Sequence, residues 1–315
     1  MKASTFGKIC AVSAMAAGAV LVSEYFSYRF IFYSPRGGQN DDHRLMVALK
    51  NKEEREKSIA MIDALNEKPF ERVEITSFDG LQLRGRYYHI ADGVPLAILC
   101  HGYRGTPSRD FCGGADICFN EVMNVLLIEE RAHCSSEGHT ITFGVKERLD
   151  VLAWTRWAVR RFGPEVKILL AGISMGASAV LMASELALPE NVRGILADCP
   201  FSSPWDIIKK VGDARGFNMD IWRPFIKMEA RIYGDFELDA AEPVTAVKHA
   251  NVPILLIHGE DDRFVPCEMS RQIAEANPEM IEFHTFPGAG HGVSYLADTE
   301  RYTKLVRDFC EKIFS

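Results

Sequence analysis

The sequence lacks the features of several protein classes. Its eight cysteines include no Cys-x-x-Cys pair, and the chain shows no short internal repeat and no low-complexity tract. The scattered cysteines are not typical of a disulfide framework and leave the redox compartment open. The formal net charge is -7 and no basic stripe is present, which argues against a nucleic-acid partner.

What is present is ordinary globular composition. The 315 residues are 47% hydrophobic and 25% charged, enough for one large α/β domain with an appendage. An Asp-Gly pair at 79–80 predicts a hairpin between strands over 73–77 and 81–88. Further apolar runs alternate with helical patterns, which predicts a mostly parallel sheet with helices on both faces. These runs cover residues 96–100, 124–128, 166–171, 192–197, 254–258 and 281–286.

One stretch interrupts the alternation. Residues 201–250 contain no obvious strand but many aromatic and methionine side chains, which predicts a helical cap inserted between two strands. We predict that Trp205, Trp222 and Phe225 line a substrate pocket in this cap. The alternative is that these side chains only pack the cap onto the main domain.

The amino terminus, residues 1–35, is the most apolar part of the chain. Residues 9–22 form a clean apolar run, which is short for a spanning helix of about 20 residues. Counting on to Tyr33 reaches that length, with tyrosines as interfacial aromatics, so a membrane anchor is the first prediction. The alternatives are a cleaved signal peptide, which would make the protein secreted, and a packed helix. Residues 36–70 are interpreted as a connector helix region, and residues 71–315 as the main domain.

The most informative motif is Gly172-Ile173-Ser174-Met175-Gly176. It follows the apolar run 166–171 and precedes an alanine-rich helical stretch, 177–188. A serine between glycines at a strand-to-helix junction is the pattern of a nucleophile elbow, in which a strained turn exposes the hydroxyl. The alternative is a small-residue turn where a helix packs close to a sheet.

A serine nucleophile needs a base and an orienting carboxylate. His291 lies in a glycine-rich loop, 288–292, after the last predicted strand, and is the candidate base. Asp262, directly after the apolar strand 254–258, is the candidate acid, with Asp261 and Asp198 as alternatives.

The oxyanion of an acyl-transfer intermediate needs preorganised N–H donors. One should be the backbone amide of Met175, the residue after the nucleophile. The second should come from the loop His101-Gly102-Tyr103-Arg104-Gly105, where we predict the amide of Tyr103. His101 is interpreted as a support for this loop. His133, Cys134 and His139 fit no usual zinc spacing, so no metal is predicted.

Six motifs in this order resemble the α/β-hydrolase superfamily, and more narrowly bacterial serine hydrolases of the serine aminopeptidase-like, esterase-lipase kind. They are HGYRG at 101–105, RAHCSSEG at 131–138, GISMG at 172–176, DCPFSS at 198–203, HGEDDRFVP at 258–266 and GAGHG at 288–292. The resemblance covers the chain from about residue 73 to its end. Relatives usually have glycine where this chain has Cys134.

The resemblance implies an α/β-hydrolase fold with Ser174 as nucleophile, Asp262 as acid and His291 as base. It implies no metal or organic cofactor. The expected activity is hydrolysis of a small acyl ester, with a thioester or amide as the alternative substrate, and an aminopeptidase of the same fold as the alternative enzyme. A binding protein on a hydrolase scaffold is the non-catalytic alternative. The membrane is an expected partner through residues 1–35, and the oligomeric state is open.

Overall fold

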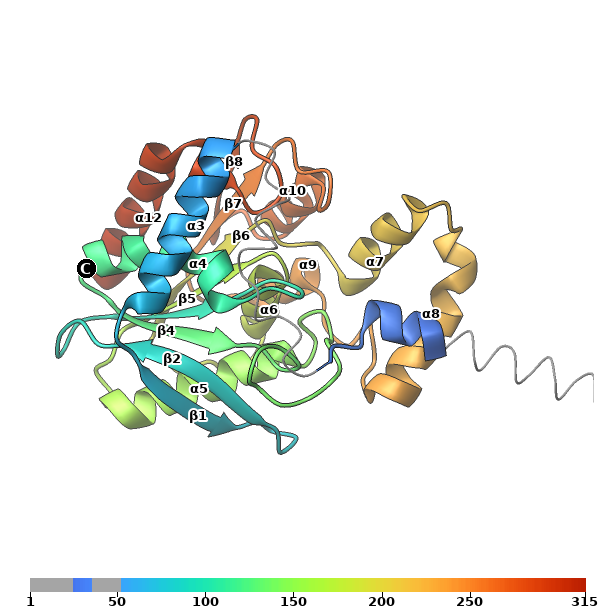
Figure 1. The fold of residues 1–315 in the computed structure, drawn as a ribbon, viewed down its shortest axis with the longest axis horizontal. Helices are drawn as coiled ribbons and strands as arrows, with labels where there is room; N and C mark the ends of the chain where they lie inside the picture. Colours follow the sequence, from blue (N-terminus) through green and yellow to red (C-terminus); the bar gives the residue numbers. More distant parts are fainter. Residues whose placement is uncertain (1–24, 36–51) are drawn as a thin grey trace, which may run out of the picture.

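A computed structural model describes residues 25–35 and 52–315 of the chain. Within these ranges the centre is an eight-stranded sheet of order β1-β2-β4-β3-β5-β6-β7-β8 (Figure 1). β2 pairs antiparallel with both of its neighbours, and every pairing from β4 to β8 is parallel. The fold is therefore the predicted mostly parallel α/β-hydrolase sheet. The strands are β1 (Glu71–Thr76), β2 (Gln82–Tyr88), β3 (Leu96–Cys100), β4 (Asn124–Glu129), β5 (Ile168–Ile173), β6 (Val192–Asp198), β7 (Ile254–Gly259) and β8 (Ile281–Phe286).

Helices cover both faces of the sheet, because its central strands are apolar on both sides. In β3, Leu96 and Ile98 point into one core layer while Ala97 and Leu99 point into the other. The first layer is closed by α5 (Glu147–Phe162), α6 (Met175–Ala183) and α10 (Cys267–Ala276). The second is closed by α3 (Lys52–Glu67), α4 (Pro107–Asn120) and α12 (Thr299–Phe314). The short α11 (Ser294–Ala297) precedes α12.

The segment between β6 and β7 is helical, as the sequence predicts. It contains α7 (Pro204–Asp213), α8 (Met219–Gly234), α9 (Pro243–Ala246) and the 3-10 turn η1 (Val247–His249). Ser203 begins α7 by accepting a hydrogen bond from the amide of Asp206, which satisfies a free N–H of the first turn. α7 and α8 stand beside the sheet and form the cap, whereas α9 returns to pack on α6 (Figure 1).

Residues 25–35, which we call the N-terminal strap, pack against this cap (Figure 1). Residues 25–31 are helical, and Tyr28 and Phe32 are buried among cap side chains. The Tyr28 hydroxyl lies 2.7 Å from the Thr140 hydroxyl, and the amide of Ile141 donates to Phe32 O at 2.8 Å. Residues 28 and 32 of the counted segment therefore lie in the core of the protein, and membrane anchoring through the terminus stays a prediction.

The remaining amino-terminal predictions, for residues 1–24, lie outside the described residues. So do residues 36–51 of the predicted connector, whereas its residues 52–67 form α3. In the described ranges no helix is both long and apolar enough to cross a membrane.

The strap contains a matched pair of phenylalanines that tests its docking. Phe32 is fully buried, whereas Phe30 is 61% exposed. We expect Phe32→Ala to lower the free energy of unfolding by about 3–5 kcal/mol through cavity formation, and Phe30→Ala to lower it far less. Urea denaturation of the two variants measures this difference. Equal stabilities would contradict the packing of the strap described above.

Candidate active site

Ser174 lies at the turn between β5 and α6 in a strained conformation, with φ 54° and ψ -116°. A Cβ on Gly172 would overlap the backbone of Gly176 and Ala177, and one on Gly176 would overlap the backbone of Cys100. Only glycine at both positions allows the helix to approach the strands this closely. The turn therefore has the geometry of a nucleophile elbow, and positive φ at a residue with a side chain costs on the order of 1–3 kcal/mol.

Three residues from distant parts of the chain meet at this turn. The Nε2 of His291 lies 2.9 Å from the Oγ of Ser174. The Nδ1 of the same ring lies 2.6 Å from Oδ2 of Asp262. Asp262 follows β7 and His291 follows β8, so both loops leave the carboxyl edge of the sheet, where Ser174 also stands. The three predicted residues are thus joined by two consecutive hydrogen bonds.

Asp262 is held as an anion although it is buried. Its Oδ1 accepts hydrogen bonds from the amides of Phe264 and Val265, both at 2.8 Å. Burial alone would raise the pKa of this carboxyl, but hydrogen bonds from His258 and His291 outweigh burial and hold the pKa well below its ordinary value. A carboxylate that stays ionised can orient the imidazole and stabilise its protonated form.

The two alternative carboxylates lie elsewhere. Asp261 is exposed. Asp198 is buried, and its Oδ2 accepts a hydrogen bond from the Tyr302 hydroxyl at 3.1 Å while its main-chain oxygen accepts from the amide of Ser174 at 2.8 Å. Asp198 therefore supports the backbone of the elbow, whereas Asp262 makes the direct contact with His291.

The loop after β3 packs directly against the elbow. A Cβ on Gly102 would lie 3.2 Å from the Cβ of Ser174. The amides on either side of Tyr103 are occupied, since Gly102 N donates to Asp110 at 2.8 Å and Arg104 N donates to Nε2 of His133 at 3.0 Å. Among the described residues the Tyr103 amide has no hydrogen-bond acceptor, and this N–H is the one that we predict to bind the oxyanion.

Two buried histidines hold this loop in place. His101 lies with Nδ1 2.9 Å from Gly102 O and with Nε2 accepting from the amide of Glu130 at 3.1 Å. His133 repeats the arrangement, with Nδ1 2.8 Å from Arg131 O and Nε2 bound to the amide of Arg104. Burial lowers the pKa of both rings, so each stays neutral and keeps the acceptor nitrogen that the backbone amide requires. These contacts agree with a supporting role for His101, and His133 shares that role.

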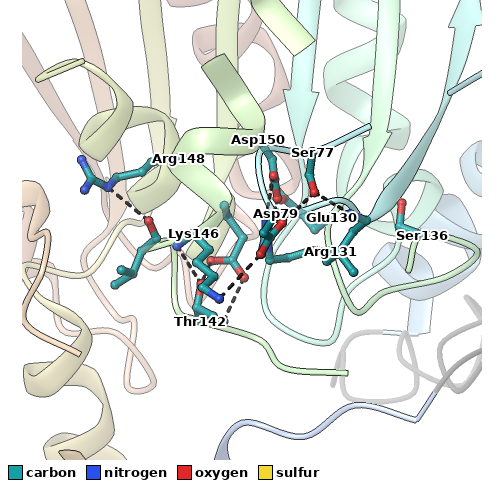
Figure 2. A network of polar contacts seen from close by, with 12 residues as sticks. Ser77, Asp79, Glu130, Arg131, Ser136, Thr142, Lys146, Arg148 and Asp150 are labelled. Atoms are coloured by element: carbon teal, nitrogen blue, oxygen red, sulfur yellow. Dashed lines mark hydrogen bonds and ion pairs between the residues drawn. The ribbon is translucent and has the colours of Figure 1, made fainter. Parts of the chain in front are cut away.

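The loop that carries His133 is fixed by Arg131 (Figure 2). The guanidinium binds Asp150 at 2.6 and 2.7 Å and Asp79 at 2.8 and 3.2 Å. Burial would raise the pKa of Asp79, but the Arg131 contacts lower it to about 2. Cys134 adopts φ 47°, a left-handed conformation that glycine adopts without strain, which agrees with the glycine that the family resemblance implies at this position.

Two cavities meet at Ser174. The first, of about 540 Å³, lies under the cap and has a mainly apolar lining. The second, of about 940 Å³, lies toward α4 and α11 and includes His291, Asp198 and Asp110. Both volumes fall in the usual range for ligand sites, about 300–1,000 Å³. A substrate can therefore place one part on each side of the serine.

Of the three predicted pocket residues, only Trp222 lines the first cavity. Trp205 packs in the cap core instead, and Phe225 lies on the exposed side of α8.

The sequence reasoning missed the strap, which supplies Phe26, Phe30 and Ile31 to the cavity wall. The helical spacing of its aromatics was the available signal, because Tyr25, Tyr28 and Phe32 share one face while Phe26 and Phe30 share another.

Within the described residues one group of side chains is close enough to hold a metal ion. It consists of Cys199, Asp262 and His291, whose ligand atoms lie within 4.8 Å of one another. Burial raises the pKa of the Cys199 thiol well above its ordinary value, so this thiol is a poor ligand. The predicted absence of a metal stays a prediction.

Comparisons with known proteins show the family and the fold of the chain. The profile of the prolyl oligopeptidase family matches residues 142–315. The Bacillus subtilis protein YqkD is 23% identical over 253 residues, which cover 78% of this chain and 82% of that protein.

Solved structures show the same fold. The Pyrococcus furiosus esterase Pf2001 superposes with a TM-score of 0.65 at 21% identity, over 78% of this chain and 92% of that one. The Pyrococcus horikoshii acylaminoacyl peptidase superposes with a TM-score of 0.56 at 17% identity, over 79% of this chain and 43% of that one.

The contact between Asp262 and His291 predicts which carboxylate matters for turnover. We expect Asp262→Asn to lower kcat by roughly 10⁴-fold, as loss of the orienting carboxylate does in the serine-protease example. Asp198→Asn keeps an acceptor for Tyr302 and should leave kcat near that of the unmodified protein. Steady-state kinetics on one ester substrate measures both variants. A larger loss in Asp198→Asn would assign the orienting role to that residue.

Asp198 also predicts a pH dependence of stability. Burial raises its pKa to about 6, against an ordinary value of about 3.9 when unfolded. Between about pH 3.9 and about pH 6 the folded state binds this proton more tightly than the unfolded state does. The contribution of the Asp198 carboxyl to the free energy of unfolding therefore falls as pH rises, and the loss is complete above about pH 7.

Asp198→Asn cannot ionise, so its free energy of unfolding should rise relative to that of the unmodified protein by about 2 kcal/mol between pH 4 and pH 8. Urea denaturation of both proteins at the two pH values measures the change, and other buried acids cancel because both proteins contain them. A stability difference that is the same at both pH values would contradict the raised pKa.

Proposed function

The chain belongs to the prolyl oligopeptidase family and is a hydrolase with the α/β-hydrolase fold. From that premise we propose that it is a serine hydrolase that cleaves carboxylic esters through an acyl-enzyme. The observation that carries the proposal is the relay from Asp262 through His291 to Ser174, placed at the junction of two cavities.

In the proposed acylation step, Nε2 of His291 takes the proton from Ser174, and the Oγ forms a bond with the acyl carbon. The carbonyl oxygen becomes an oxyanion that accepts hydrogen bonds from the amides of Tyr103 and Met175. The bond to the leaving alkoxide then breaks, and His291 returns the proton to that oxygen. Water repeats the same sequence on the acyl-enzyme and releases the carboxylic acid.

Asp262 contributes without transferring the proton itself. Its contact with Nδ1 fixes the tautomer that leaves Nε2 free as a base, and its negative charge stabilises the imidazolium that forms. Because its pKa lies well below neutrality, this role persists across the physiological pH range.

The first cavity supports an acyl substrate over a free amino terminus. Its lining is mainly apolar, and the charged residues that the described part of the chain contributes to it are Arg104 and Arg215. A free ammonium group would need a carboxylate partner, and this cavity wall supplies none among the described residues. An apolar acyl chain under the cap, with the leaving group in the second cavity, fits both linings.

An amide substrate is the second candidate. The family name and the similarity to an acylaminoacyl peptidase favour it. An acylated amine carries no positive charge, so such a substrate would also suit the apolar cavity.

A direct test combines labelling with two substrates. We expect a fluorophosphonate probe to label the protein at Ser174, and Ser174→Ala to abolish both labelling and ester hydrolysis. Turnover of p-nitrophenyl esters should exceed that of aminoacyl anilides with a free amino group.

Ser178 provides the matched control, since its hydroxyl lies one helical turn away and points to Phe201 O and Ser174 O. Ser178→Ala should keep the label. Labelling that survives Ser174→Ala would refute the nucleophile assignment, and faster cleavage of an acylated anilide would favour the amide candidate. Binding of esters without turnover would indicate a non-catalytic binding protein.

A further inference from the structure

Helix α8 is apolar on two sides. One side packs into the cap core through Met219, Trp222, Ile226 and Ala230. A second apolar stripe has the spacing i, i+4, i+7 and i+11 and faces outward; it consists of Ile221, Phe225, Met228 and Ile232. A surface helix ordinarily has polar residues on its outer side. Ile221 is 64% exposed and Ile232 is 59% exposed, so both ends of the stripe are uncovered in the described part of the protein.

The N-terminal strap lies beside this stripe. The ring centroid of Tyr25 lies 5.8 Å from that of Tyr233 on α8, and Ser27 binds Glu229 of the same helix. Phe26 and Phe30, one helical turn apart, are exposed by 67% and 61%. We call the outward side chains of the strap and α8, together with Phe217 between α7 and α8, the apolar face.

The apolar face gathers most of the exposed large hydrophobic side chains. Of thirteen such side chains among the described residues, eight come from residues 25–30 and 217–232. Scattered exposed apolar residues need no explanation, whereas their concentration in two neighbouring segments is typical of an interaction site.

The apolar face also surrounds the way into the first cavity. Phe26, Phe30 and Phe217 are exposed and at the same time line that cavity, so it reaches the surface between them. The same cavity ends at Ser174. Whatever covers the apolar face therefore controls access to the nucleophile through the first cavity, whereas the second cavity reaches Ser174 from the other side.

A lipid bilayer suits this face better than a second protein copy. A protein partner seated there would close the cavity, whereas a bilayer would place acyl chains at its mouth. Three exposed arginines belong to the same segments as the face: Arg29 to the strap, Arg223 to α8, and Arg215 lies over the ring of Phe30. Their positive charges suit phospholipid headgroups. The chain outside the described residues joins at residue 25, next to the face, and carries the apolar run 9–22 preceded by Lys2 and Lys8. An apolar terminal run and a docked apolar face together give a stable attachment that one of them alone does not.

We propose that the apolar face docks onto a phospholipid bilayer, so that a membrane lipid passes an acyl chain directly into the cavity under the cap. This inference rests on the proposed function for its substrate, but the docking itself requires no turnover. The net charge of -7 gives the protein no general attraction to anionic membranes, so docking depends on insertion of the apolar side chains.

Trp222 on α8 reports docking without catalysis. The full chain carrying Ser174→Ala is mixed with vesicles of phosphatidylcholine brominated in its acyl chains, and the same protein with Trp222→Phe gives the contribution of the other tryptophans. We expect bromine to quench Trp222, and Ile221→Ser with Ile232→Ser to remove most of that quenching. In active protein the same pair should lower hydrolysis of a vesicle-embedded ester about tenfold or more, with turnover of a soluble short-chain ester unchanged.

The matched control removes two exposed hydrophobic side chains from other parts of the surface. Ile90 and Met280 are 41% and 36% exposed, and Ile90→Ser with Met280→Ser should keep both quenching and vesicle hydrolysis. The conservative pair Ile221→Val with Ile232→Val should also keep them, which separates loss of docking from loss of folding.

Equal quenching in the stripe variant and its control would overturn the proposal. So would a change from dimer to monomer in the stripe variant without vesicles, measured by light scattering, because the face would then join two copies. If Ser174→Ala still hydrolyses esters, the proposed function fails while the quenching result still decides the docking.

Discussion

The strained turn at Ser174 is the constraint on which the site depends. Its positive φ persists because Gly172 and Gly176 let α6 press against β3 and β5, with no room for a side chain at either position. That contact lifts the hydroxyl out of the sheet edge, where the loops after β7 and β8 can reach it. If the turn relaxed, Ser174 would move away from His291, and the imidazole would have no hydroxyl within hydrogen-bond distance.

The loop opposite the serine is held by a chain of buried polar contacts. Arg131 joins the β1–β2 hairpin to α5 through Asp79 and Asp150 (Figure 2). The backbone it fixes carries His133, and His133 in turn holds the amide of Arg104, next to the free amide of Tyr103. Because both supporting histidines are neutral and buried, the position of the Tyr103 N–H is fixed before any substrate arrives. This preorganisation is the property that transition-state stabilisation requires.

The sequence predicted the sheet well because its strands are short apolar runs separated by long helical patterns. It also identified Ser174, Asp262 and His291 as candidates, since each follows a predicted strand and lies in a glycine-rich or acidic stretch. The cap was harder, because an aromatic side chain on an amphipathic helix looks the same whether it faces a core, a cavity or solvent. Trp205 and Phe225 were assigned to the pocket on that ambiguous signal. The strap was not recognised as part of the cavity wall for a related reason, since packing against a distant helix and contact with lipid favour the same residues.

The central claim is that the Ser174 oxygen attacks the acyl carbon and carries the acyl group. The direct measurement is rapid acid quench of the protein during turnover of an ester, followed by mass analysis of its peptides. The account predicts a mass increase equal to the acyl group on the peptide containing Ser174, appearing before the steady state. Turnover with no acylated peptide, or with the acyl group on another residue, would contradict it.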